Sequence, residues 1–195
     1  MIFSIISLTV FIIAFVWLFT SLQAAGRGAG DTLKWWRQHY RRKRAVAHEH
    51  GWLSPSSLRY LSYFFALDFL LLLAITGFFQ PVFLLKPMSG LLLLLHLTIA
   101  PFFAAALLIF VLFWVEKQKP KDGESSRHKR LKMCFWTILV LACVSILSIG
   151  LSMFPLAGTQ LQLILLAVHK YAAVALVVAA VVHAYFVIQL FMKQQ

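Results

Sequence analysis

Long apolar runs separated by short polar stretches dominate the chain. Four such runs carry almost no charge: Met1 to about Ala25, about Leu61 to Phe83, the run between Lys86 and Glu116, and Met133 to Val168. Crossing a hydrocarbon core of roughly 30 Å takes about 20 helical residues. The last run is too long for one crossing and is interrupted by Pro155 and Gly158, which favour a turn. We therefore place the fourth span at about 133–153 and the fifth at about 161–191, and predict an all-α membrane protein with five transmembrane helices.

Composition and charge agree with this pattern and add an orientation. The chain is 62% hydrophobic and only 12% charged over 195 residues, which excludes a water-soluble domain. All but three of the 18 Lys and Arg residues lie in segments 26–59 and 116–132. Helix counting puts both segments on one side, which should be cytoplasmic, with the N-terminus outside and the C-terminus inside. The basic pI follows from this topology and requires no nucleic acid.

The first 58 residues precede the expected four-helix part of the chain. Segment 1–25 resembles a signal peptide in its small residues near position 25, but it lacks a basic start and is too long, so we interpret it as a retained helix. Segment 26–58 interleaves aromatic residues with cations, which favours contact with anionic lipid at the inner interface, although an acidic protein partner would also fit. Ser56 or Ser57 could cap the next helix. Residues 59–195 should form the four-helix domain.

Three of the seven histidines lie at membrane depth, where ionisable side chains usually face the bundle interior and serve a function. His169 and His183 are separated by fourteen residues, about 40° short of four helical turns, so they share one face of the fifth span about 21 Å apart along its axis. His96 should lie at the depth of His169, because both follow shortly after the outer end of their spans. The remaining four histidines lie in the inner connections, where solvation is the default: His39, His48, His50 and His128.

Two imidazoles at one depth on different helices are the ligands that six-coordinate haem iron needs. Small residues near them would admit a flat ring, and Lys170 or Lys86 could pair with propionates at the outer surface. The alternative for each histidine is a helix-to-helix hydrogen bond. We favour His96 and His169 as ligands of one haem iron because their depths match.

These residues resemble the bacterial membrane cytochromes b that serve respiratory formate dehydrogenases and nickel-iron hydrogenases. The segment "VHKYAAVALVVAAVVHAYF" is similar to that family's last core helix, with a histidine pair fourteen residues apart at His169 and His183. The segment "LLLHLTIAPFFAAALL" looks like its second core helix, with His96 as the ligand. The resemblance implies a four-helix haem-binding core in a bacterial inner membrane, here with one additional N-terminal helix.

The first core helix departs from the family. The segment "LRYLSYFFALDFLLLLAITGFF" is similar in pattern, but the expected ligand position falls at Ser62 or Tyr63, and neither is histidine. A second, inner haem is therefore absent, or His183 binds it with a second ligand from His48, His50 or a neighbouring chain, or with no second ligand. Asp68 is the one carboxylate at membrane depth, and with His183 it could relay protons or hold a quinone head group, or it could be a structural partner.

The function that these observations favour is electron transfer. The resemblance implies a b-type cytochrome subunit that moves electrons between a membrane quinone and an extracytoplasmic cytochrome or iron-sulfur subunit of a respiratory complex, with substrate chemistry on another subunit. No motif indicates a stand-alone enzyme. A transporter or proton-conducting protein and a haem-free structural anchor remain the alternatives.

Overall fold

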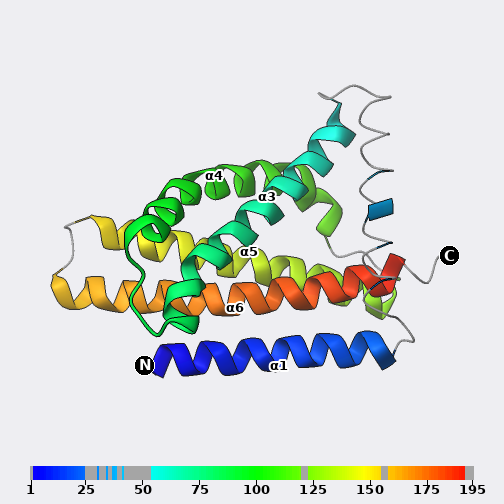
Figure 1. Ribbon diagram of the computed structural model, residues 1–195. Coiled ribbons are helices and arrows are strands. Elements are labelled where there is room, and N and C mark those ends of the chain that lie inside the picture. The colour runs from blue at the N-terminus through cyan, green and yellow to red at the C-terminus, as the bar shows by residue number, and fades with distance from the viewer. Residues whose placement is uncertain are drawn as a thin grey trace. The chain divides into compact units, whose positions relative to one another are not determined.

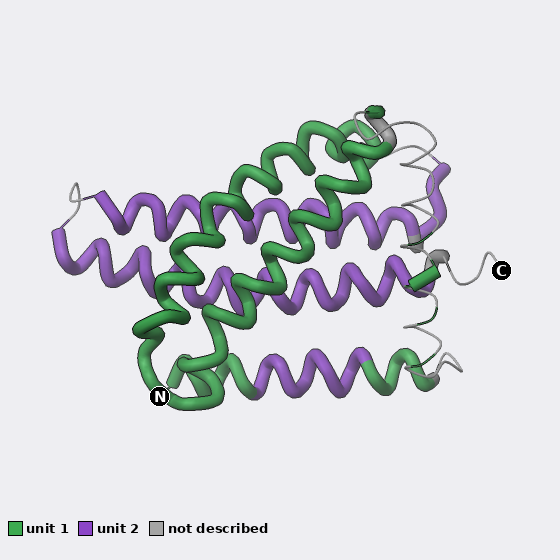
Figure 2. The backbone as a smooth tube through the Cα atoms, turned by 45° about the horizontal axis from the view of Figure 1, so that its top comes forward, with its two compact units in different colours: residues 1–8, 19–119 green, residues 9–18, 120–195 purple. Residues whose placement is uncertain are grey.

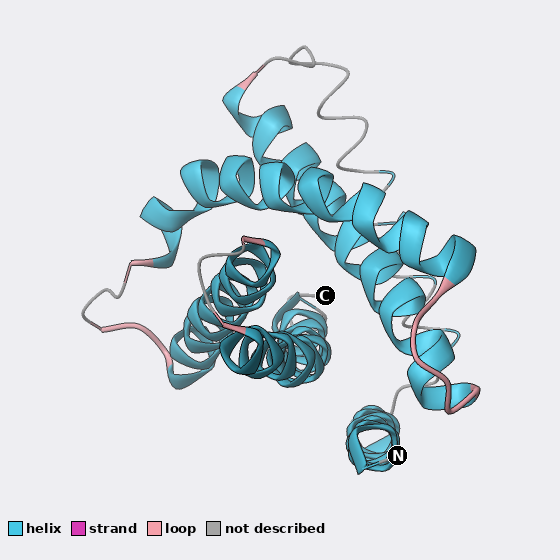
Figure 3. Ribbon diagram, turned by 90° about the vertical axis from the view of Figure 1, so that its left-hand side faces the viewer, coloured by secondary structure: helices cyan, strands magenta, loops and turns pink. Residues whose placement is uncertain are grey.

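A computed structural model of the protein describes residues 2–24, 30, 34, 37–38, 41, 54–119, 123–154 and 158–191. It contains five long helices (Figure 1): α1 (Ile2–Ala24), α3 (Pro55–Phe78), α4 (Gly90–Trp114), α5 (Ser126–Met153) and α6 (Thr159–Phe191). Helices and loops account for all of the described chain, which includes no strand (Figure 3). All five helices are long and apolar enough to cross a membrane. The prediction of an all-α protein with five membrane-spanning helices is confirmed.

The helix ends follow local chemistry. Ser54 caps α3 by accepting a hydrogen bond from the Ser57 amide at 3.2 Å, and Pro55 occupies the first turn. The expectation that Ser56 or Ser57 is the cap was therefore wrong. Proline suits the first helical position because its φ is already fixed and its missing N–H is not needed there, so the helix begins earlier. At the expected break between the fourth and fifth spans, α5 ends at Met153 and α6 begins at Thr159.

The helices belong to two compact units (Figure 2), residues 1–8 with 19–119 and residues 9–18 with 120–195. In the first unit α3 packs on α4. The Trp114 indole N–H donates to the carbonyl oxygen of Arg59 at 2.9 Å, and the Trp114 ring lies 6.0 Å from that of Tyr63. A tryptophan whose ring is partly buried usually finds such a partner for its N–H. These contacts fix the register of α3 and α4 near the end where α3 begins.

The second unit is built on the pair α5 and α6. Its helices meet through small residues, including the fully buried Ala142 and the buried Ala172. Small side chains let membrane helices approach closely, because lipid provides no hydrophobic drive for association. The middle of α1 joins this unit, where Trp17 packs edge-on to Tyr185 with ring centroids 4.9 Å apart.

Large apolar side chains are exposed on the helices, as a surface in lipid requires. Ile2 is 74% exposed, Leu91 72% and Leu112 78%. The predicted inside and outside assignment of the termini stays a prediction, as does the single four-helix domain at 59–195. Segment 26–58 lies largely outside the described residues, as do His39, His48 and His50.

Candidate functional site

His96 is held by the helix that precedes it in the chain. Its Nδ1 atom lies 3.1 Å from the hydroxyl oxygen of the buried Thr76 on α3. The Thr76 hydroxyl donates its proton to the carbonyl oxygen of Leu72, at 2.8 Å. Because that proton is committed, Thr76 can only accept from His96, so Nδ1 carries the imidazole proton and Nε2 carries the lone pair.

Gly77 lies directly against the His96 ring. A Cβ atom at position 77 would stand 3.0 Å from Cε1 and 3.3 Å from Nδ1 of His96, closer than ordinary van der Waals contact. Any larger residue would push the ring away from α3. The sequence "TG" at 76–77 therefore provides both the hydrogen-bond acceptor and the space that the imidazole needs.

His169 shows the same arrangement in the second unit. Its Nδ1 lies 2.9 Å from the backbone carbonyl oxygen of Ser145 on α5 and 3.1 Å from the hydroxyl of the same residue. A carbonyl oxygen only accepts, so Nδ1 must be protonated and Nε2 again carries the lone pair. Ser148 donates to the same carbonyl oxygen at 3.0 Å. Ser145 and Ser148 are both buried, which shields these contacts from competing water.

His183 differs from the other two histidines. It lies on α6, fourteen residues after His169, and its Nδ1 is buried with no hydrogen-bond partner in the described part of the chain. A buried polar atom without a partner is costly and calls for an explanation. No oxygen fixes the tautomer of His183 there, in contrast to His96 and His169.

The other predicted site residues are exposed. Asp68 lies on the face of α3 away from α4, two positions after the buried Ala66, and Lys170 is exposed next to His169. The expected position of the missing histidine falls at Ser62 or Tyr63. The Ser62 hydroxyl donates to the Arg59 carbonyl at 2.9 Å, and the Tyr63 ring packs against Phe110 and Trp114. The Ser62 hydroxyl is occupied in bonding to its own helix.

The structure places His96 and Asp68 in one unit and His169, His183 and Lys170 in the other. The members of each predicted pair lie in different units. The pairing of His96 with His169 and that of Asp68 with His183 therefore stay predictions. The described residues contain no group of three or more His, Cys, Asp or Glu side chains that could hold a metal ion. A bis-histidine haem needs only two.

Sequence reasoning missed the oxygens that orient the two histidines. Thr76 and Ser145 are hydroxyl residues in apolar helices, and hydroxyls at such positions commonly bond to their own helix, which Thr76 also does. Only the packing of α3 on α4 and of α5 on α6 identifies them as histidine partners. Comparison of the chain with protein-family models, curated proteins and solved structures finds no match.

Proposed function

We propose that this protein is a membrane-embedded electron-transfer subunit that holds a b-type haem through His96 and His169. Electrons would pass between a membrane quinone and an extracytoplasmic redox partner in a larger complex. One observation supports the proposal: Nδ1 of each histidine lies within hydrogen-bond distance of an oxygen on a neighbouring helix, 3.1 Å from the Thr76 hydroxyl and 2.9 Å from the Ser145 carbonyl. These are the helix-to-helix hydrogen bonds that the sequence offers as the alternative to ligation, and they are compatible with it because they make Nε2, not Nδ1, the nitrogen that would bind a metal.

Such a hydrogen bond prepares a histidine to bind a metal. A ligating imidazole almost always donates its second ring N–H to an oxygen, which fixes the tautomer, orients the ring and makes the ligating nitrogen more basic. Thr76 and Ser145 occupy these positions for His96 and His169. In both cases Nε2 is the nitrogen that would face the iron.

The residues around the histidines fit a flat cofactor. The glycine at position 77 leaves His96 against bare helix backbone. On α6, shortly after His169, Ala172 is buried and Ala173 is half-buried. Lys170 is exposed, and on this proposal its ammonium group pairs with a propionate near the outer surface. A haem bound here supplies reversible one-electron transfer at its iron.

His183 and Asp68 have a separate role in this proposal. Among the residues that the structure describes, His183 has no oxygen acceptor like those of the other two histidines, which favours one haem over two. Its buried nitrogen and the Asp68 carboxylate are two titratable groups at membrane depth that would bind a quinone head group or relay its protons.

The proposal is tested by the absorbance of the purified protein. We expect a reduced-minus-oxidised spectrum of low-spin haem b after dithionite, and partial reduction of the same bands by a short-chain quinol. Denatured protein with the same reagents is the control. A colourless protein that stays colourless after expression with added haem precursor would contradict the proposal and leave a transporter, proton channel or structural anchor.

A further inference from the structure

An apolar groove runs along the second unit. It has a volume of about 490 Å³ and lies between α5, α6 and the middle of α1, with walls that include Val10, Thr137, Ala175, Ala179 and Val182. Its lining is almost wholly apolar, with the Cys134 thiol and the Thr137 and Tyr171 hydroxyl groups as the polar exceptions. In a membrane, such a groove is in contact with hydrocarbon.

The groove has the length of one leaflet. On α6 its lining runs from Tyr171 to Val182, which is about 16 Å at 1.5 Å per residue. Half of a hydrocarbon core of roughly 30 Å is about 15 Å. The groove therefore matches the depth that the acyl chains of a single leaflet occupy.

A cation lies at one end of the groove. Arg130 is on the same face of α5 as Cys134, Thr137 and Leu141, because these positions are spaced by four, three and four residues. One turn beyond Val182 on α6, Phe186 continues the other wall. The guanidinium carbon of Arg130 lies 5.6 Å from the centre of the Phe186 ring. Arg130 and Phe186 thus join the two walls just past the apolar lining.

Arg130 retains its ability to bind an anion. A cation–π contact is made through the aromatic ring and uses none of the hydrogen-bond acceptors that a guanidinium requires, so the five N–H donors of the arginine still suit the oxygens of a phosphate. Arg130 is exposed and forms no ion pair with any residue that the structure describes. Its charge is therefore available at the end of the groove.

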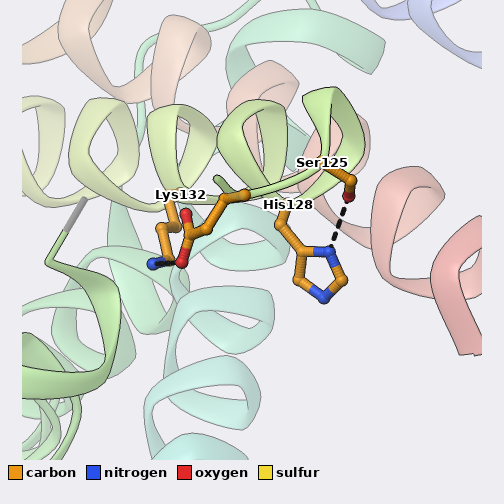
Figure 4. A network of polar contacts seen from close by, with 4 residues as sticks. Ser125, His128 and Lys132 are labelled. Carbon is orange, nitrogen blue, oxygen red and sulfur yellow. Dashed lines mark hydrogen bonds and ion pairs between the residues drawn. The ribbon is translucent and has the colours of Figure 1, made fainter. Parts of the chain in front are cut away.

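The neighbouring groups at the start of α5 are engaged differently (Figure 4). Lys132 forms an ion pair with Glu124, and the His128 Nδ1 lies 2.9 Å from the Ser125 hydroxyl. Lys132 is also two positions from Arg130, and so lies on the opposite side of the helix. Lys129 is exposed and one position from Arg130, which makes it a matched control.

We infer that this groove binds an anionic phospholipid, with an acyl chain along Ala175 and Ala179 and the phosphate at Arg130. Apolar walls of leaflet depth fit the acyl chain, and the Arg130 guanidinium at their end fits the phosphate of the headgroup. On the topology predicted from the basic segments, this end lies at the cytoplasmic surface, where anionic lipids attract cations. The site is independent of the haem proposal, because neither His96 nor His169 lines the groove.

Native mass spectrometry tests the inference. The detergent-purified protein is incubated with equal amounts of phosphatidylglycerol and phosphatidylcholine, and the bound lipids are counted per chain. We expect the wild type to retain phosphatidylglycerol preferentially. Arg130→Gln should lower that preference about fivefold, the factor expected for one interfacial cation, whereas Lys129→Gln should leave it unchanged.

A second pair of variants tests the apolar walls. Ala175→Phe should fill the groove and reduce the retention of both lipids several-fold. Ala184→Phe is the matched control, because Ala184 is exposed on α6 and lies two positions from Val182, on the opposite face. Equal retention of the two lipids by the wild type would overturn the inference. An equal loss of phosphatidylglycerol preference in Arg130→Gln and Lys129→Gln would also overturn it. A third contrary result would be that the protein, incubated with a neutral quinone in place of the lipids, retains the quinone equally well in the wild type and in Arg130→Gln.

Discussion

Replacing His169 with alanine is expected to lower the haem content of the purified protein more than tenfold and to abolish the low-spin spectrum. The physical reason is the loss of an Nε2 ligand whose tautomer is fixed by the Ser145 carbonyl at 2.9 Å. His96→Ala should have the same effect, since a six-coordinate iron needs both axial ligands. The measurement is the reduced-minus-oxidised absorbance per chain, with helix content followed by circular dichroism.

Two further histidines serve as controls for this pair. His128→Ala should leave the haem spectrum unchanged, because His128 is exposed at the start of α5 and contacts Ser125. His183→Ala should also spare the low-spin signal. Loss of all haem in His183→Ala, with haem kept in His169→Ala, would contradict the assignment of the ligands.

The second large effect is expected at Gly77. Gly77→Val places Cβ 3.0 Å from Cε1 of His96 and adds two methyl groups beyond it, so the imidazole must move away from α3. That movement lengthens the 3.1 Å contact between Nδ1 and the Thr76 hydroxyl. Disturbing an outer-shell partner of a metal ligand typically costs about 10–100-fold in affinity, so we expect the haem concentration needed for half occupancy, measured by haem titration, to rise by about that factor.

Gly150→Val is the matched control for Gly77→Val. Gly150 is also within a long helix, and a Cβ atom there would meet nothing within 4 Å. Both variants change helix propensity equally, so a difference in haem occupancy reports the contact with His96. Equal occupancy in the two variants, each folded, would show that the ring does not depend on the space at position 77.

The helices could be predicted because the lipid solvent imposes a simple rule. A chain in hydrocarbon must satisfy its backbone within each helix, so apolar runs of about 20 residues mark the spans. The break expected in the last long run falls between α5, which ends at Met153, and α6, which begins at Thr159. The N-cap of α3 was predicted wrongly because the segment offers several serines that could cap a helix: Ser54, Ser56 and Ser57. Proline favours the first turn of a helix, so Pro55 favours Ser54 as the cap.

The candidate site could be predicted only in part. Periodicity places His169 and His183 on one face of a helix, because that relation lies within a single element. The contact of Ser145 with His169 spans 24 residues and two helices, and it depends on how α5 and α6 pack. The contact of Thr76 with His96 likewise joins two helices across 20 residues. Such contacts have no signature in one sequence, although they decide which imidazole nitrogen can bind a metal.

The exposure of Asp68 was also beyond sequence reasoning. Its position among apolar residues marked it as a carboxylate at membrane depth, but a single position does not reveal which face of α3 meets α4. The buried residues Ser62, Ala66 and Thr76 define that face, and Asp68 lies away from it. A carboxylate on such a face is expensive in lipid, which keeps it a candidate for proton or quinone contact.

The most direct test of a haem held by His96 and His169 is a quantified pyridine haemochrome assay, expressed as haem b per chain of purified protein. The account predicts about one haem b per chain. A value near zero in folded protein, prepared from cells that are replete in haem, would contradict it.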